Sequence, residues 1–301
     1  MTKHFQQGKA KQGYEPSLRV RIIRSIASSV IAVLQLNGRT RWSNEFMQAL
    51  NPSMTVPVPG FTESTGEMLW FRTGHGRLYW RVTESPGLEA VTNHWISRLS
   101  PRDVLFDVGA NIGLYAMTAA KYRSVRVFAF EPDLMNARLL YENVLRNNLE
   151  KSVAVLPIAL DSVSRLQDFH LKSLSYGDAL HNLGHASRYV RNPSGFVATV
   201  AAFALDDLIL NLKIPSPSHL KIDVDGNEIE VLRGAYKTLA TVKEILVEVD
   251  LESANASKID ALLVSAGFLL HLQGEEVVAW NKCVERLYVR PKSGVAHPDN
   301  T

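Results

Sequence analysis

The sequence predicts an α/β fold with a central, mostly parallel sheet and helices on both faces. Apolar runs of strand length alternate with helical patterns from 104 to 158 and again from 220 to 249, which is the order expected of βαβ units. The runs VRVFAF and EILVEV are apolar at most positions, as strands covered on both faces are. We expect the parallel strands in the order 3-2-1-4-5, with an antiparallel hairpin at the sheet edge.

The individual elements follow from the hydrophobic periodicity. The expected parallel strands are 104–108, 125–130, 153–158, 220–224 and 245–249. The expected helices between and after them are 111–122, 134–147, 228–239 and 255–266. Strands at 68–72 and 78–82 and a helix at 87–99 should precede this sheet. Short strands near 277–280 and 285–289 should form the edge hairpin.

The chain divides into three parts. Residues 1–60 form a basic arm with an amphipathic helix and a proline-rich, linker-like end at 52–60; residues 61–291 form the main domain; residues 292–301 form a tail. The net charge is +3, but the first 50 residues hold eight Lys or Arg against two Asp or Glu, so the remainder carries −3. Nucleic-acid-binding surfaces are basic, so we expect no nucleic-acid partner.

The amphipathic helix predicted within the arm has an apolar stripe that runs from Ile22 to Leu34. The stripe fits packing against the main domain or a second copy of the chain, and a weak contact with a membrane surface is the alternative. The longest uncharged apolar stretch, 25–38, has 14 residues, short of the roughly 20 that a membrane span needs. One cysteine, Cys283, excludes an intrachain disulfide and favours a reducing, cytoplasmic location.

A glycine-rich turn follows the first parallel strand. Asp107 lies near the end of that strand, and Gly109, Ala110, Asn111 and Gly113 lead into the next helix. Glycine in such a turn allows the backbone to approach a ligand closely.

Glu131 ends the second parallel strand, 24 residues after Asp107, where nucleotide-binding sheets place the acceptor of the ribose hydroxyls. A dinucleotide site would show GxGxxG, and Asp107 would repel a pyrophosphate. S-Adenosylmethionine carries a sulfonium and an ammonium, which a carboxylate attracts, so the charge favours the methyl donor over NAD. The alternative is that Asp107 and Glu131-Pro132 only cap helices.

A second group of acids follows the fourth and fifth parallel strands. Asp223 and Asp225 end the fourth strand, Glu228 begins the next helix, and Glu248 and Asp250 end the fifth strand. The expected strand order places Asp223 beside the glycine turn, where it would accept a proton, bind the donor or bind a metal. Neighbouring carboxylates should raise its pKa toward neutrality. A Mg²⁺ site is possible but not favoured.

Two of these acids have simpler interpretations. Asp225 fits a turn and helix cap, and Glu228 fits the helix dipole. Residues 161–200 interrupt the βα rhythm and read as a substrate loop. Within it, His181 and His185 could orient or deprotonate a substrate, although solvated loop histidines are the alternative.

The chain resembles the FkbM family of S-adenosylmethionine-dependent methyltransferases over residues 100–250. The resemblance is carried by DVGANIG (107–113), AFEPD (129–133), LYENVLRNN (140–148), ALDD (204–207), KIDVDGNEIEVLRGA (221–235) and ILVEVD (245–250). It implies the Rossmann-like class I methyltransferase fold and O-methylation of a sugar, glycan or polyketide-like metabolite. An NAD-linked sugar oxidoreductase and a non-enzymatic donor-binding or scaffold module remain as alternatives.

The resemblance places Asp107, Gly109, Asn111 and Gly113 around the methionine part of the donor, Glu131 on the ribose, and Asp223 with nearby acids at the reacting centre. Together with the residue-level arguments above, it gives the following site. The expected donor-binding residues are Asp107, Gly109, Ala110, Asn111, Gly113, Glu131, Pro132, Ala159 and Asp223. The expected catalytic residues are Asp223, Asp225, His181 and Glu248. The family commonly has Glu where this chain has Asp225, which keeps the charge but shortens its reach. Acceptor specificity is expected to lie in 161–200.

Overall fold

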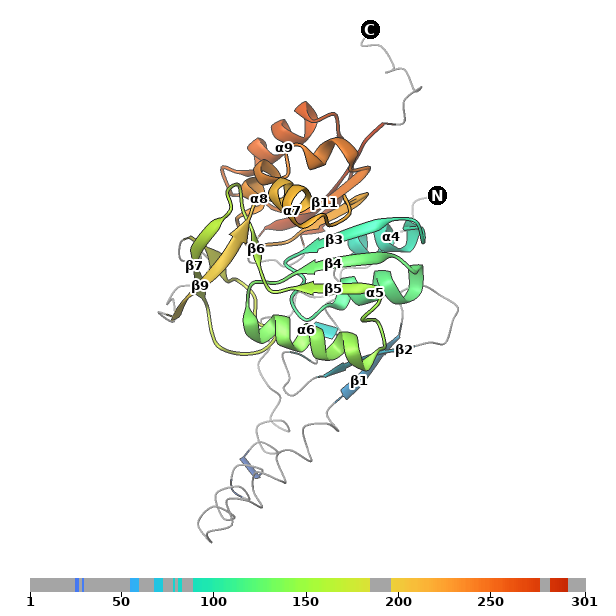
Figure 1. Ribbon diagram of the computed structural model, residues 1–301, viewed down its shortest axis with the longest axis vertical. Helices are drawn as coiled ribbons and strands as arrows, with labels where there is room; N and C mark the ends of the chain where they lie inside the picture. Colours follow the sequence, from blue (N-terminus) through green and yellow to red (C-terminus); the bar gives the residue numbers. More distant parts are fainter. Residues whose placement is uncertain are drawn as a thin grey trace.

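A central sheet of seven strands organises the protein (Figure 1). The computed structural model describes residues 25, 26, 29, 55–59, 68–72, 78, 81, 82, 89–184, 196–276 and 282–291. The strand order is β12-β13-β11-β10-β3-β4-β5. The parallel strands are β3 (Val104–Val108), β4 (Arg126–Phe130), β5 (Val153–Leu156), β10 (His219–Ile222) and β11 (Glu244–Asp250). The expected order 3-2-1-4-5 is therefore confirmed.

The antiparallel edge hairpin is present, but its first strand begins earlier than expected. It consists of β12 (Leu269–Glu276) and β13 (Cys283–Val289), and β13 pairs with β11. The expected strand at 277–280 lies outside the described residues. Gly267, with a φ of +85°, follows helix α9, so the chain enters β12 only two residues later.

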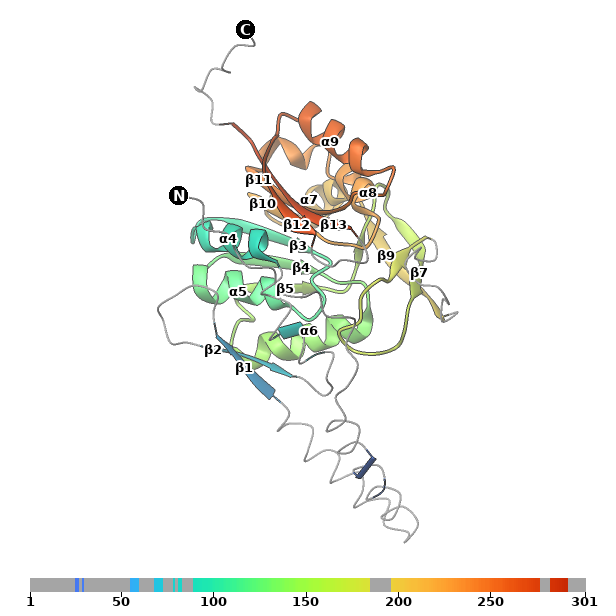
Figure 2. The same ribbon diagram turned by 180° about the vertical axis from the view of Figure 1, so that it is seen from behind.

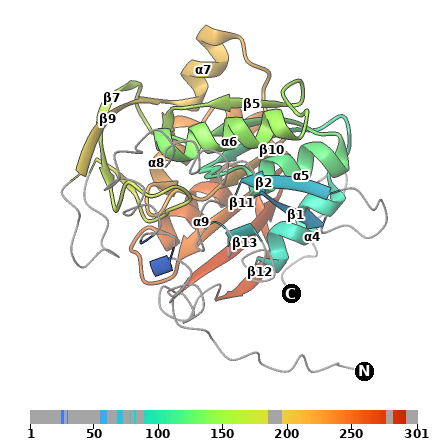
Figure 3. The ribbon, with the colours of Figure 1, turned by 90° about the horizontal axis from the view of Figure 1, so that it is seen from below.

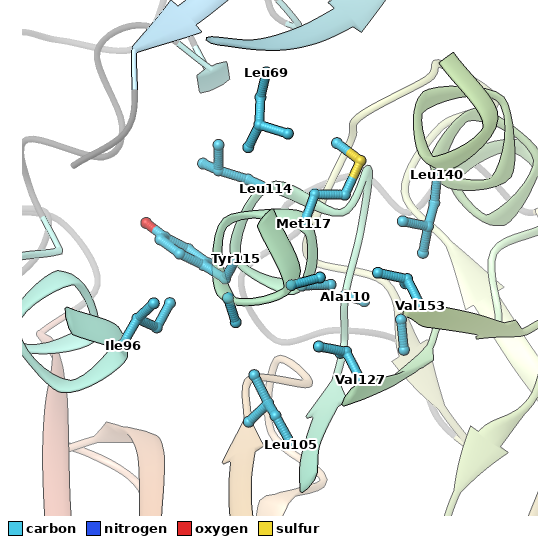
Figure 4. Packing of buried hydrophobic residues seen from close by; sticks show 14 of the residues in the cluster. Leu69, Ile96, Leu105, Ala110, Leu114, Tyr115, Met117, Val127, Leu140 and Val153 are labelled. Atoms are coloured by element: carbon cyan, nitrogen blue, oxygen red, sulfur yellow. The ribbon is translucent and has the colours of Figure 1, made fainter. Parts of the chain in front are cut away.

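Helices cover both faces of the central sheet (Figures 1 and 2). One apolar core joins the sheet to α4 (Ala90–Arg98), α5 (Leu114–Arg123) and α6 (Leu134–Arg146). Figure 4 shows Leu114 and Met117 of α5 on the side of Leu69, with Leu105 and Val127 of the sheet on the other side of the helix. The second core joins the sheet to α7 (Leu205–Leu212), α8 (Glu228–Gly234) and α9 (Ala256–Ser265). The 3₁₀ helix η2 (Thr238–Thr241) follows α8.

A second sheet stands where we expected a loop at 161–200. Its order is β6-β9-β7-β8, from β6 (Ala159–Leu160), β7 (Arg165–Leu171), β8 (Asn182–Leu183) and β9 (Phe196–Phe203). The carboxyl ends of β3, β4 and β5 point toward the side where β7 and β9 lie, and these two strands project beyond α8 (Figures 1 and 3). The expectation of an irregular loop is therefore wrong for the described part, and His185 lies outside it.

Two expectations for the segment before the central sheet are also wrong. The predicted linker at 52–60 contains β1 (Thr55–Pro59), which pairs antiparallel with β2 (Met68–Arg72); prolines are tolerated there because β1 is an edge strand. In the predicted strand 78–82, Leu78, Arg81 and Val82 are helical. Leu78 and Val82 are both buried and lie four residues apart, which places them on one face of a helix.

Little of the basic arm is described. Ser25, Ile26 and Ser29 are helical and exposed; the other residues of the predicted amphipathic helix, and the tail at 292–301, lie outside the described residues. Within the part of the chain that the structure describes, no helix has the length and apolar character needed to cross a membrane.

Two asparagines of α6 attach β2 to the main domain. Asn147 accepts a hydrogen bond from the Trp70 amide (2.8 Å) and donates one to the Trp70 carbonyl (2.8 Å). Asn143 accepts from the Arg72 amide (3.0 Å) and donates to the Ile112 carbonyl (3.1 Å). Both asparagines belong to the LYENVLRNN motif, and both side chains therefore have a structural role.

We expect Asn147→Ala to lower the free energy of unfolding by about 2–4 kcal/mol, because it leaves backbone groups of Trp70 without partners in a partly buried place. Urea denaturation followed by circular dichroism measures the change. Arg146→Ala is the matched control, because Arg146 is exposed on the same helical turn. Equal midpoints for the two variants would contradict the role assigned to Asn147.

Candidate active site

The glycine turn lies against the ends of both neighbouring strands. Gly109, Asn111 and Gly113 have φ values of +84°, +49° and +88°. The Gly109 and Ala110 amides each donate to the Phe130 carbonyl at 3.0 Å. A Cβ atom on Gly109 would lie 1.8 Å from the carbonyl oxygen of Asp223. The turn therefore packs between the carboxyl ends of β4 and β10 with no room for a side chain at Gly109.

Asp107 is buried directly beneath this turn, with 1% of its surface exposed. It faces Lys221 across the β3–β10 register and Ala129 across the β3–β4 register. Burial raises its pKa to about 6, although Lys221 opposes the rise. Its Oδ1 atom has no hydrogen-bond partner within the described part of the chain. A buried carboxyl oxygen in this state is suited to a ligand that donates hydrogen bonds or carries positive charge.

Glu131 fixes the turn from the β4 side. One carboxyl oxygen accepts from the Asn111 amide at 2.7 Å, and the other accepts from the Asp133 amide at 2.9 Å. Burial raises the pKa of Glu131 to about 8. Each carboxylate oxygen has a second lone pair, so Glu131 can still accept from a ligand's hydroxyl groups.

Lys221 and Glu248 determine the charge of Asp223. The Lys221 ammonium is 4% exposed and lies 2.8 Å from Asp223 Oδ2. Burial acts to raise the pKa of Asp223, but the Lys221 charge and hydrogen bonds from Lys221 and Glu248 hold it below its usual value. Burial and then the Asp223 charge raise the pKa of Glu248 well above its usual value. Asp223 is therefore ionised while Glu248 keeps its proton.

The direction of the Asp223 shift corrects the sequence-based expectation. Neighbouring acids were expected to raise its pKa, and they do act in that direction on Glu248. For Asp223 the effect that raises the pKa is burial, and the buried ammonium two residues earlier, with a hydrogen bond from Glu248, outweighs it.

Asp225 faces the 176–182 segment. Its Oδ2 atom accepts from the Leu180 amide at 2.6 Å, and its carbonyl accepts from Asn182 Nδ2 at 2.9 Å. Burial, followed by the Asp223 charge, raises the pKa of Asp225 to about 6. Glu228 accepts from the Gly226 amide at 2.8 Å, and burial raises its pKa to about 7. Glu228 thus stabilises the turn before α8, whereas the Asp225 carboxylate binds the backbone of a remote segment and does not cap the helix.

A family model described as the methyltransferase FkbM domain matches residues 107–270, more than half of the chain. The chain belongs to the FkbM methyltransferase family. It is thereby an enzyme of the S-adenosylmethionine-dependent methyltransferase class. The match spans the glycine turn, Glu131, the Asp223 strand and Glu248, so the motifs of the sequence resemblance all lie within it.

Several known proteins are similar to this FkbM methyltransferase. Hexuronic acid methyltransferase AglP of Haloferax volcanii is 28% identical over 64% of this chain and 75% of its own. The 31-O-demethyl-FK506 methyltransferase FkbM of Streptomyces tacrolimicus is 26% identical over 60% of this chain and 78% of its own. The crystal structure of methyltransferase FkbM from Methylobacillus flagellatus covers 70% of this chain and 52% of its own, with a TM-score of 0.46 and 16% identity.

Two of the expected site residues of this FkbM methyltransferase have structural partners in the protein. His181 is buried; its Nδ1 accepts from the Lys172 amide at 3.0 Å, and its Nε2 lies 3.3 Å from Asp133 Oδ2. Both nitrogens therefore face protein groups, which suits a positioning role. Ala159 begins β6 and is buried with Phe169 in the core of the second sheet.

The sequence interpretation missed the residues that tie 176–182 to the FkbM glycine turn. Asn111 and Asn136 both donate to the Asp178 carbonyl, at 2.8 and 3.1 Å, and the Gly177 amide donates to Asn136 at 2.6 Å. Gly177 has a φ of +70°, and a Cβ there would lie 2.2 Å from Leu78. The sequence did contain one signal of these contacts: polar residues such as Asn136 lie on the face of a helix that its periodicity predicts to be buried.

Among the described residues, no group of three or more His, Cys, Asp and Glu has the arrangement of a metal site.

Proposed function

We propose that this protein transfers the methyl group of S-adenosylmethionine to a hydroxyl of a sugar, glycan or similarly hydroxylated metabolite. The observation that carries the proposal is the position of Asp223: its backbone packs against the glycine turn of an FkbM methyltransferase, and its carboxylate lies 2.8 Å from the buried Lys221 ammonium. The names of two relatives, which mention a hexuronic acid and an O-demethyl compound, support this class of acceptor.

The residues around the turn fit the donor. Asp107 offers a buried, unpartnered carboxyl oxygen that suits the donor's positively charged methionine part. Gly109 and Gly113 have positive φ angles. Because neither residue has a side chain, a ligand can approach the backbone of the turn closely. We assign Glu131 to the ribose hydroxyls, with Ala110, Asn111 and Pro132 alongside. When bound, S-adenosylmethionine supplies a methyl group activated by the sulfonium.

We assign the proton transfer to Asp223. As the acceptor oxygen forms its bond to the methyl carbon, the carbon–sulfur bond breaks and its electron pair stays on sulfur. The ionised Asp223 carboxylate takes the hydroxyl proton. Lys221 holds Asp223 in place and keeps it charged, while Glu248, already protonated, donates to it. Positioning of the two reactants contributes much of the rate in such a displacement.

We expect Glu131→Ala to weaken donor binding about ten- to a hundredfold, because the hydrogen bonds between the ribose hydroxyls and the Glu131 carboxyl are lost. Isothermal calorimetry with S-adenosylmethionine measures this. Glu131→Gln keeps the side-chain volume and one acceptor oxygen, and should lose less affinity. Glu150→Ala, on the exposed turn after α6, is the control. Unchanged affinity in a folded Glu131→Ala protein would show that the ribose lies elsewhere.

The proposed reaction is tested by incubating the protein with isotopically labelled S-adenosylmethionine and a panel of glycosides and hydroxylated metabolites. Mass spectrometry should find the labelled methyl on an oxygen of one of them. Calorimetry with NAD should show no binding under conditions where S-adenosylmethionine binds. Binding of NAD in place of S-adenosylmethionine would overturn the proposal in favour of an oxidoreductase.

A further inference from the structure

A small cavity opens beside the proposed reacting centre, at the carboxyl ends of β10 and β11. It has a volume of about 110 Å³ and lies where α8 and α9 begin. Its polar lining residues are Asn182, Asp225, Glu228, Asp250, Ser253 and Asn255. Asp225 lies two residues from Asp223, so the cavity adjoins the position from which the proposed base acts.

Asn182 gives the cavity an unsatisfied hydrogen-bond acceptor. The residue is 4% exposed, and its Nδ2 atom is committed to the Asp225 carbonyl. That hydrogen bond fixes the orientation of the amide, and its Oδ1 atom has no hydrogen-bond partner among the residues that the structure describes. A buried amide oxygen without a donor is costly unless a ligand or a water molecule supplies one.

The rest of the lining is also rich in acceptors. Three of its residues carry carboxyl groups: Asp225, Glu228 and Asp250. Among the described residues that line the cavity, none is Lys, Arg or His. The complementary ligand therefore presents several hydrogen-bond donors and no negative charge. The hydroxyl groups of a neutral sugar meet both conditions, since each donates one hydrogen bond and adjacent hydroxyls can share a carboxylate.

We infer that this cavity is the acceptor subsite, and that it takes the hydroxyls of an uncharged sugar and discriminates against sugars that bear a carboxylate. The inference rests on the proposed function and adds a specificity to it, one that would distinguish this chain from the relative named as a hexuronic acid methyltransferase. It also gives β8 a role, because Asn182 comes from that strand of the second sheet. A uronate would place its negative charge among three carboxyl groups, whereas a neutral ring would only exchange water for the same acceptors.

The test compares two matched probes, methyl glucopyranoside and methyl glucopyranosiduronate, for binding to the full chain saturated with S-adenosylhomocysteine. Ligand-observed NMR titration measures both affinities. We expect the neutral glycoside to bind at least about tenfold more tightly. Asn182→Ala should weaken the neutral glycoside about tenfold, and Asp250→Asn should reduce its advantage over the uronate about threefold. Asp168→Asn, exposed on β7, is the charge-matched control and should change neither affinity.

Each other outcome counts against the inference. Equal binding of the two glycosides would overturn the charge selectivity. If Mg²⁺ displaced the neutral glycoside, the cavity would be a cation site and not a sugar subsite. If neither glycoside binds at 50 mM while S-adenosylhomocysteine does, the subsite inference fails and the proposed methyl transfer still stands. Failure to bind S-adenosylhomocysteine would instead count against the proposed function. Circular dichroism of Asn182→Ala and Asp250→Asn checks that both variants are folded, so that a loss of binding is not due to unfolding.

Discussion

Asp223→Asn is expected to lower the rate of methyl transfer about 10²–10⁴-fold with donor affinity largely retained. The substitution keeps the shape of the side chain but removes the proton acceptor. In the folded protein Asp223 is held ionised by Lys221, 2.8 Å away, so the carboxylate is available as a base throughout the neutral range. Single-turnover kinetics with labelled donor measure the chemical step, and calorimetry measures donor affinity.

Other roles of Asp223 give different results in the same experiment. A donor-binding role predicts lost affinity in Asp223→Asn, and a metal-ligand role predicts that EDTA abolishes the activity of the unchanged protein and that Mg²⁺ restores it. Glu248→Gln should lose less activity than Asp223→Asn, because an amide replaces a carboxyl that already holds its proton. A fully active Asp223→Asn enzyme would falsify all three roles.

Gly109→Ala should be the most damaging single methyl addition near the site. The new Cβ would lie 1.8 Å from the Asp223 carbonyl oxygen, and a backbone atom held in the sheet cannot move aside as a side chain can. The φ of +84° adds strain. We expect a loss of more than about 3 kcal/mol in the free energy of unfolding, and loss of donor binding in any protein that stays folded.

Gly184→Ala is the matched control for backbone strain. Its φ of +81° is nearly the same, but its Cβ would meet only the end of the Gln167 side chain, at 2.8 Å. It should therefore cost about 1–2 kcal/mol, the price of the left-handed conformation alone. Urea denaturation compares the two variants, and equal losses would show that the contact between Gly109 and Asp223 is less tight than the structure has it.

The central sheet could be predicted because strands that are buried on both faces appear in the sequence as continuous apolar runs. The second sheet carries no such signal: Leu166 of β7 is 73% exposed and Val197 of β9 is 52% exposed. Its strands form through pairing with one another, a long-range effect that local periodicity does not show. Strand β1 was missed for a different reason: the prolines of an edge strand resemble those of a linker.

The site shows a similar division. Asp107, Glu131 and Asp223 were placed correctly at strand ends, because a parallel sheet brings its carboxyl ends to one edge. The charge state of Asp223 could not be predicted, because a lysine inside a strand gives no sign in the sequence of whether it faces solvent. Lys221 faces inward, and its charge and hydrogen bond, together with the hydrogen bond from Glu248, lower the pKa of Asp223. The positions of His181 and Asn182 could not be predicted, because they depend on the second sheet, which the sequence analysis did not predict.

The hydrogen bonds from Asn143 and Asn147 to β2 have a consequence for association between molecules. Strand β2 has two hydrogen-bonding edges, and it uses one of them to pair with β1. Its other edge would present the free amides of Trp70 and Arg72 to any extended chain nearby. The two side-chain amides of α6 occupy those groups without themselves offering a strand to extend. A helix thus closes the edge of this hairpin against aggregation by strand addition.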